Sequence, residues 1–250
     1  MLLNILATLV SLLPLTFIYL WLKNKLKDDP GYKIECKNAL GRGMLTVFWV
    51  ILFSGVSYVL LRLTGLHETV PLLYQCLYDF IVLALMEELA KYLSFRKLLK
   101  KTSYPYSWLD CVSFMTIVSI GFSLLECIEY AIGANALVIL IRGICLPHAG
   151  FGFIEGYFHG KALAENKPGL KWAGILISWL LHGLYDFSLS EEFGKLNDNL
   201  VFIPLILVIV DIILVIRLIR FAKKARNDER YTAPLVFPET AEPVNDPVFE

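Results

Sequence analysis

The chain has 250 residues, of which 57% are hydrophobic and only 18% are charged, and its mean hydropathy is +0.62. This composition is too apolar for an ordinary soluble domain and is typical of a polytopic membrane protein. Basic and acidic residues number 23 each, so the net charge is zero, and we expect no nucleic-acid partner. The five cysteines show no C-x-x-C spacing, which argues against a disulfide framework and a thiolate zinc site.

Seven apolar runs, each near the ~20 residues that cross the hydrocarbon layer, predict an all-α polytopic membrane protein with about seven transmembrane helices. The runs are Leu2–Leu22, Met44–Leu63, Leu72–Phe95, Leu109–Ile132, Leu137–Gly160, Trp172–Leu189 and Leu200–Phe221. The first run has no positive charge ahead of it and no small-residue cleavage site, so we expect a retained helix and not a signal peptide. The basic segment between the first two runs contains the turn signal Asp28-Asp29-Pro30-Gly31 and is predicted to be a loop.

The basic residues predict the orientation in the membrane. Most of the 23 lie in the segments 23–42, 96–101, 161–171 and 217–230, which would share one side of the bilayer. By the positive-inside rule this side is the cytoplasm, so the N-terminus lies outside and the C-terminus is cytoplasmic. After Arg226 the composition shifts to prolines and scattered acids. We therefore expect one transmembrane domain over residues 1–226 and a disordered cytoplasmic tail over residues 227–250.

Two adjacent glutamates and a lysine stand inside the third run, as Glu87-Glu88-x-x-Lys91. An ionisable group at mid-membrane costs at least ~2.5–3.5 kcal/mol and needs an interior partner. On a helix, Glu87 and Lys91 are four residues apart and Glu88 and Lys91 three apart, while the two glutamates project about 100° from each other. We expect one glutamate to pair with Lys91 and the other to face a cavity.

Acids and histidines recur in the next runs at helical spacings. Glu126 and Glu129 share one helical face, and Arg142 returns at about the depth of Glu129, so we assign Arg142 to Glu129 or to Glu126. His182 and Asp186 also share a face, which lets the carboxylate hold the imidazole in one tautomer or share a ligand with it. At ~1.5 Å per residue, several of these groups reach a similar depth and are expected to form one central polar cluster. Its expected members are Glu88, Glu126, His148, His182 and Asp186.

A stripe of small residues starts at His148 and continues with Gly152, Gly156 and Gly160 at four-residue steps. Such overlapping G-x-x-x-G units let another helix approach closely in a membrane, and helix packing is the ordinary explanation for them. His148 on the same face raises the alternative that the approaching backbone belongs to a substrate. We expect Gly152 to border that groove.

Four motifs, in this order and on successive runs, resemble the PrsW family of intramembrane proteases, which is distantly similar to the CAAX prenyl proteases. They are Glu87-Glu88-x-x-Lys91, Gly121-Phe122-x-x-x-Glu126, His148-x-x-x-Gly152-x-x-x-Gly156 and His182-Gly183-x-Tyr185-Asp186-Phe187. The resemblance implies a bacterial protease that cuts membrane-anchored anti-sigma factors. It implies a catalytic set of Glu87, Glu88, Glu126, His148 and His182. The family usually has asparagine after the fourth-helix glutamate, where this chain has Cys127.

Peptide hydrolysis needs an activated water, a group that polarises the carbonyl and a proton donor for the leaving amine. A glutamate in a water-filled cavity can act as the base, and nearby histidines can bind Zn²⁺ or stabilise the oxyanion directly. Because the chain has no H-E-x-x-H helix, a metal would need ligands from several helices, and the candidates are His148, His182 and Glu126. The sequence leaves zinc and a metal-free glutamate mechanism open. Lys91, Asp186, Arg142, Gly152 and Gly156 are expected to support the site.

A proton-coupled transporter is the main alternative, because ionisable residues inside a membrane are also what a proton relay requires. The missing internal repeat and the lack of matched broken helices argue against it. A non-catalytic membrane receptor on a protease-like scaffold is the third interpretation, although it would not need to retain Glu87, Glu88, His148 and His182. We expect a multi-pass protein of the bacterial cytoplasmic membrane, embedded in the lipid bilayer and acting on single-span membrane proteins.

Overall fold

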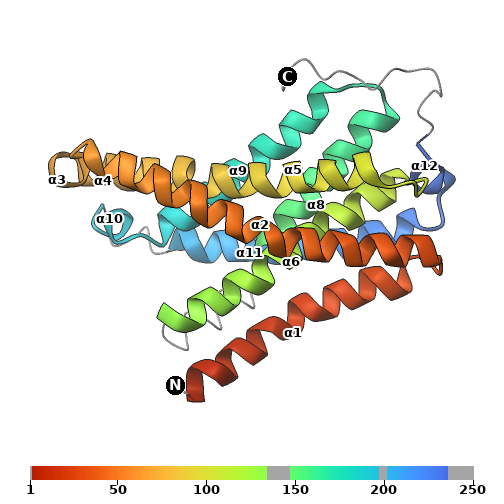
Figure 1. Ribbon diagram of the computed structural model, residues 1–250, viewed down its shortest axis with the longest axis horizontal. Coiled ribbons are helices and arrows are strands. Elements are labelled where there is room, and N and C mark those ends of the chain that lie inside the picture. The colour runs from red at the N-terminus through yellow and green to blue at the C-terminus, as the bar shows by residue number, and fades with distance from the viewer. Residues whose placement is uncertain (1, 134–146, 197–201, 236–250) are drawn as a thin grey trace.

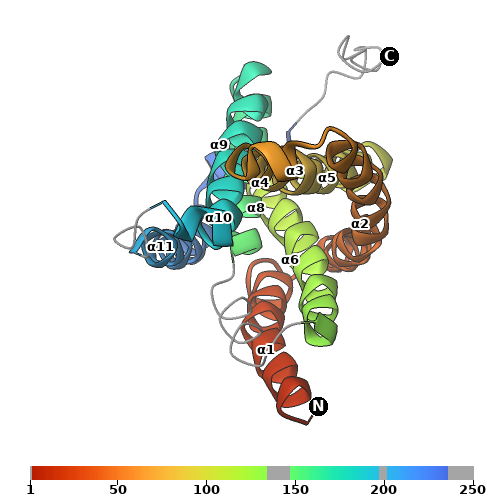
Figure 2. The same cartoon turned by 90° about the vertical axis from the view of Figure 1, so that its left-hand side faces the viewer.

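The computed structural model describes residues 2–133, 147–196 and 202–235, and every named element within these ranges is helical. Figure 1 shows a bundle of long helices, and Figure 2, turned by 90°, shows α8 inside the bundle with α6 and α9 beside it. Helix α8 (Pro147–Ala164) contacts the long helices α6 (Trp108–Gly133), α9 (Gly169–Ser188) and α11 (Phe202–Ala225). Short helices are α3 (Leu66–Thr69), α10 (Glu191–Gly194) and α12 (Glu229–Thr232).

Four helices of the described ranges are long and apolar enough to cross a membrane, by length and composition. They cover residues 3–25, 30–63, 108–129 and 202–225. Large apolar side chains such as Leu13, Phe48 and Ile209 point outward from them, as a lipid-facing surface requires. The all-helical class is therefore confirmed, together with several candidate membrane spans. The total of seven spans and the N-out, C-in orientation stay predictions.

Helices α1 (Leu2–Lys25) and α2 (Pro30–Leu63) are separated by only four residues. The prediction of a loop in the basic segment between the first two runs is therefore wrong for residues 30–42, which belong to α2. The Asp29 side chain accepts a hydrogen bond from the Tyr32 backbone N–H at 2.8 Å, and Pro30 occupies the first helical position. Both features start a helix, so the Asp-Pro pair is a helix cap and not only a turn signal. At ~1.5 Å per residue, α2 is about 51 Å long and extends well beyond a ~30 Å hydrocarbon layer.

The third apolar run forms a continuous helical rod in three parts. α4 (Pro71–Leu77) leads directly into a π-helical segment, η1 (Tyr78–Leu85), and then into α5 (Met86–Lys101). The apolar run over Leu72–Phe95 predicts a single helix and gives no indication of the π-helical part. π-helical turns are rare and occur frequently at functional sites.

Residues 228–235, at the start of the predicted tail, include α12 and pack on the bundle. The Tyr231 ring lies 4.8 Å from the Trp108 ring between centroids. The Leu235 backbone N–H donates a hydrogen bond to the Tyr106 carbonyl at 3.0 Å. These contacts fasten the segment after α11 to the start of α6. The division of the chain into one domain and a disordered tail stays a prediction.

The glycine stripe of α8 faces α6. A Cβ atom on Gly152 would lie 2.6 Å from Ser119 Oγ, and one on Gly156 would lie 2.7 Å from the Cys111 carbonyl oxygen. Both distances are shorter than van der Waals contact, so the missing side chains let the two helices touch. Gly152 and Gly156 therefore serve helix packing. The expectation that Gly152 borders a substrate groove is wrong, because α6 already occupies that space.

Replacing Gly152 by leucine is expected to destabilise the bundle by about 1–3 kcal/mol, the usual cost of overpacking a tight contact. The new side chain would have to displace Ser119 and the Met115 carbonyl, which lies 3.0 Å from the added Cβ. Thermal unfolding in detergent measures the effect. Gly55→Leu is the matched control, because nothing lies within 4 Å of a Cβ added there. Equal melting temperatures for the two variants would contradict the packing role.

Candidate metal and catalytic site

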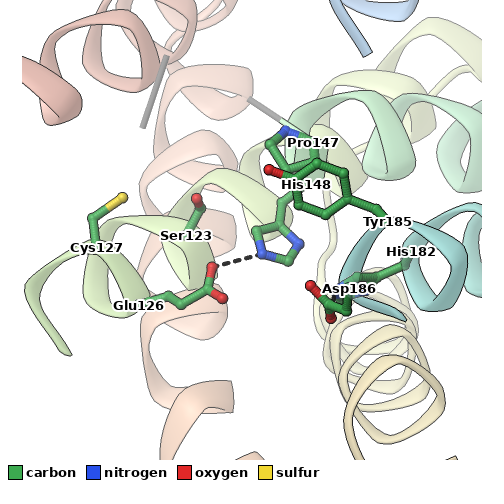
Figure 3. Close-up of a pocket in the computed structure, with 8 residues that line it drawn as sticks. All are labelled: Ser123, Glu126, Cys127, Pro147, His148, His182, Tyr185 and Asp186. Atoms are coloured by element: carbon green, nitrogen blue, oxygen red, sulfur yellow. Dashed lines mark hydrogen bonds and ion pairs between the residues drawn. The ribbon is translucent and has the colours of Figure 1, made fainter. Parts of the chain in front are cut away.

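The predicted polar residues of four different helices come together in the middle of the bundle. Glu87 and Glu88 lie in the first turn of α5, Glu126 on α6, His148 in the first turn of α8, and His182 on α9. Figure 3 shows His148 between Glu126 on one side and His182 with Asp186 on the other. The expected central cluster is confirmed. The polar cluster consists of Glu87, Glu88, Lys91, Glu126, His148, His182 and Asp186.

A fully buried ion pair lies within the polar cluster. Lys91 Nζ donates a hydrogen bond to Glu88 Oε1 at 2.7 Å, and both side chains are 0% exposed. The same ammonium lies 3.0 Å from His148 Nδ1 and 4.8 Å from the centre of the Phe122 ring. Because two buried charges are tolerated only when they are paired, each holds the other in place. The predicted pairing of one glutamate with Lys91 is confirmed, and that glutamate is Glu88.

His182 is surrounded by three carboxylates. Its Nδ1 lies 2.6 Å from Glu88 Oε1, and its Nε2 lies 3.2 Å from Asp186 Oδ2. Glu87 Oε2 is 3.8 Å from the same Nε2. With Glu88 accepting from Nδ1–H, Nε2 is the ring nitrogen that faces the other two carboxylates. A carboxylate that holds one imidazole nitrogen and presents the other is the usual support of a metal-binding histidine.

His148 is held on both nitrogens as well. Since Lys91 donates to its Nδ1, the proton of the neutral ring is on Nε2, which lies 2.6 Å from Glu126 Oε2. The Glu126 side chain is 17% exposed, whereas those of Glu88 and Lys91 are 0% exposed. Glu126 is thus a carboxylate that a substrate could reach. It belongs to a pocket lined by Ser123, Glu126, Cys127, Pro147, His148, His182, Tyr185 and Asp186 (Figure 3).

Three residues of the polar cluster could hold a metal ion. Glu87, His148 and His182 each offer one ligand atom, and the three atoms lie within 4.8 Å of one another. Glu87 Oε2 is buried and accepts no hydrogen bond from the described part of the chain. Two imidazole nitrogens and one carboxylate oxygen suit Zn²⁺, and three protein ligands leave a fourth position for water. The residues present therefore fit a zinc ion.

The geometry changes the expected ligand set at one position. The sequence predicts Glu126 as the third metal ligand beside His148 and His182. In the structure the carboxylate that lies close to both histidines in this way is that of Glu87. Glu126 contacts His148 Nε2 from the pocket side. The signal for Glu87 was present in the sequence, since one glutamate of the pair was expected to face a cavity. Arg142 lies outside the described residues, so its predicted partner stays a prediction.

Another contact near the site was not predicted. The Trp179 indole Nε1 on α9 donates a hydrogen bond to the Phe80 carbonyl of η1 at 2.6 Å. No sequence pattern identifies an indole that bonds to a backbone carbonyl of another helix. This contact lies next to the polar cluster, because His182 follows Trp179 by one helical turn.

A helical bundle with candidate membrane spans and a buried histidine–carboxylate site for a metal defines an intramembrane metalloprotein. The chain belongs to a family of this class, the PrsW family of intramembrane metalloproteases, whose family model matches residues 38–215. That range includes the whole polar cluster. The family expected from the four motifs is confirmed.

Curated relatives named Protease PrsW are similar to parts of this chain. The protein of Geobacillus kaustophilus is 36% identical over 97 residues, covering 36% of this chain and 41% of that protein. The Bacillus subtilis protein is 36% identical over 97 residues, covering 35% and 44%, and the Clostridioides difficile protein is 24% identical over 195 residues, covering 74% and 79%. The matched part thus spans less than half of the first two relatives. No solved structure matches the chain.

Proposed function

We propose that this chain is a zinc-dependent endopeptidase that hydrolyses a peptide bond of a membrane-anchored protein at the polar cluster. The observation that carries the proposal is the convergence of Glu87, His148 and His182 ligand atoms within 4.8 Å beside a pocket that also contains Glu126. Membership in a family of metalloproteases favours this function over a transporter or a non-catalytic receptor.

The residues divide into those that would hold the ion and those that would orient its ligands. Glu87, His148 and His182 would bind zinc, which when bound polarises a carbonyl and lowers the pKa of a bound water. Glu88 accepts a hydrogen bond from His182 Nδ1–H and so presents Nε2 toward Glu87. Lys91 neutralises Glu88 and fixes the direction of its carboxylate.

Glu126 is the proposed general base and acid. It is the more exposed of the two carboxylates that line the pocket, 17% against 12% for Asp186, and its bond to His148 keeps it beside the proposed ligands. Glu126 would take a proton from the attacking water on a carboxylate oxygen and deliver it to the nitrogen of the leaving amine. This double use balances the reaction, because peptide hydrolysis transfers one water proton to the new amine. Asp186 lies across the pocket from Glu126, next to His182 Nε2, and would keep the His182 ring in place (Figure 3).

The proposed substrate is a single-span membrane protein, and within that class an anti-sigma factor. The candidate membrane spans and the intramembrane family support a substrate that reaches the pocket from the bilayer. The resemblance to the PrsW proteases supports an anti-sigma factor as the substrate, and it also supports the bacterial cytoplasmic membrane as the proposed location. The distribution of basic residues supports seven spans with the N-terminus outside and the C-terminus in the cytoplasm.

Purified protein in detergent is expected to bind one zinc ion per chain and to lose that binding when His182 is replaced by alanine. Zinc affinity is expected to rise with pH, because zinc competes with protons for the imidazole nitrogens of His148 and His182 and for the Glu87 carboxylate. Metal analysis after dialysis, with competition by a chromophoric chelator at several pH values, measures both effects. His67→Ala, a histidine outside the polar cluster, is the control. A wild-type protein that cleaves its substrate without bound metal would exclude the zinc mechanism.

A further inference from the structure

The helix that carries Glu87 and Glu88 changes its winding just before them. The π-helical segment η1 ends at Leu85, and Glu87 follows two residues later. In an α-helix each residue advances by about 100°, and a π-helical turn takes up more residues. The direction of every later side chain therefore depends on where the π-helical segment begins and ends. Because an isolated helix rarely adopts this winding, a neighbouring element has to stabilise it.

Helix α9 supplies two such contacts, and both involve Phe80 of η1. The Trp179 Nε1–H donates to the Phe80 carbonyl oxygen at 2.6 Å. Gly183 makes room for the Phe80 ring, since a Cβ there would lie 2.5 Å from Phe80 Cδ1 and 2.8 Å from Cγ. Trp179, Gly183 and Phe187 follow at four-residue steps on one face of α9, and the Phe187 ring lies 6.2 Å from the Phe80 ring. We call Phe80, Trp179, Gly183 and Phe187 the η1–α9 seam.

The seam and the polar cluster lie on the same two helical segments. His182 directly precedes Gly183, and its ring contacts Glu88 at 2.6 Å through Nδ1 and Glu87 at 3.8 Å through Nε2. A shift of the π-helical register by one residue would turn both glutamates by about 100°. At least one carboxylate would then leave His182. The contacts at Phe80 thus determine whether Glu88 can hold the imidazole while Glu87 faces the metal position.

We propose that Trp179 and Gly183 are positioning residues that fix the register of η1 and thereby hold Glu87 and Glu88 on the two ring nitrogens of His182. The role rests on the metal site proposed above. A residue that only stabilises the fold would lower the melting temperature without a selective effect on zinc affinity. A positioning residue changes zinc affinity in the fraction of protein that remains folded.

Trp179→Phe tests the hydrogen bond, because phenylalanine keeps an aromatic ring and removes the N–H donor. We expect zinc affinity to fall about 10- to 100-fold, the usual effect of losing a group that orients a metal ligand. The probe is zinc alone, titrated against a chromophoric chelator with the full chain in detergent. Hydrogen–deuterium exchange over residues 78–88 is expected to become faster in the same variant. Exchange reports the winding of η1 without metal or substrate.

Trp108→Phe is the matched control. The Trp108 indole Nε1 also donates to a backbone carbonyl of a neighbouring helix, that of Tyr157 at 3.0 Å. This bond joins α6 to α8 at the end of the bundle where α12 packs. The control variant is expected to lose comparable stability while keeping zinc affinity and the exchange rate of residues 78–88.

Gly183→Ala tests the second contact of the seam. The added methyl group would push on the Phe80 ring, and zinc affinity is expected to fall. Removing that ring in the double variant Gly183→Ala/Phe80→Ala is expected to restore part of the affinity. A double variant that binds zinc as weakly as Gly183→Ala would contradict the proposed contact.

The outcomes separate this inference from the proposed function. Wild-type zinc affinity and unchanged exchange in Trp179→Phe would overturn the positioning role, whatever the catalytic mechanism. A wild-type protein that binds no zinc would overturn the metal site. In that case faster exchange of residues 78–88 in Trp179→Phe, but not in Trp108→Phe, would still support the seam, and equal exchange in both would overturn it.

Discussion

Replacing Glu87 by glutamine is expected to abolish proteolysis and to lower zinc affinity by more than ~100-fold, while the protein still accumulates in the membrane. The loss should exceed that of an orienting group, because Glu87 is itself a proposed ligand. Glutamine has nearly the same volume. Glu87 Oε2 accepts no hydrogen bond from the residues that the structure describes, so the change breaks no bond seen at this atom. Fragments of co-expressed single-span membrane proteins, quantified by immunoblot, measure cleavage.

Glu68→Gln is the control for this experiment, because Glu68 is a 79% exposed acid on the short helix α3. It is expected to keep full activity and zinc binding. Full cleavage by Glu87→Gln at normal abundance would remove Glu87 from the mechanism. The ligand set first expected from the sequence, with Glu126 beside the two histidines, would then be preferred.

Replacing Lys91 by methionine is expected to destabilise the protein by about 3–5 kcal/mol, the usual effect of leaving one partner of a buried ion pair alone. Methionine fills much of the same space, so the loss comes mainly from the charge. Glu88 is 0% exposed and would lose the charged donor at 2.7 Å, keeping only the bond from His182 among those seen at Oε1. Denaturant unfolding in mixed micelles and the amount of protein in the membrane measure this effect.

The double variant Lys91→Met/Glu88→Gln is expected to recover most of the stability, because neither buried charge then remains. The glutamine oxygen can still accept the hydrogen bond from His182 Nδ1–H. Activity is not expected to return, since a neutral amide holds the imidazole more weakly than a carboxylate. A Lys91→Met variant as stable as the wild type would show that the ion pair between Lys91 and Glu88 does not contribute to stability.

Much of the polar cluster could be predicted because buried charges restrict their surroundings. Burying the charges of Glu87, Glu88 and Lys91 in an apolar run costs free energy, so these groups need interior partners. Helical spacing then predicted that one of the two glutamates pairs with Lys91. Spacing also aligned His182 with Asp186, and depth in the membrane brought Glu126 and His148 to the same level. These arguments use distances along a helix, which the sequence determines directly.

The remaining differences arise where rotation between helices decides the contact. Spacing gives the direction of a side chain on its own helix but not the rotation of that helix relative to its neighbours. For this reason Glu126 was expected as the third metal ligand, whereas the structure brings Glu87 to the two histidines. The stripe at Gly152 indicated a close approach without identifying α6 as the partner. Apart from Asp79, the residues from Tyr78 to Leu85 are ordinary apolar and aromatic residues, and their composition gives no sign of π-helical winding.

The contact between α12 and α6 bears on the order in which the protein can be assembled during synthesis. Trp108 begins α6, yet the Tyr231 ring that covers it also packs on Phe221, at 5.2 Å, near the end of α11. Translation proceeds from the N-terminus, so all helices of the polar cluster leave the ribosome before this cover exists. The polar cluster can therefore form first, and the packing of Tyr231 over Trp108 follows later. A ribosome stalled before residue 231 would display the helices of the site with one end of the bundle still open.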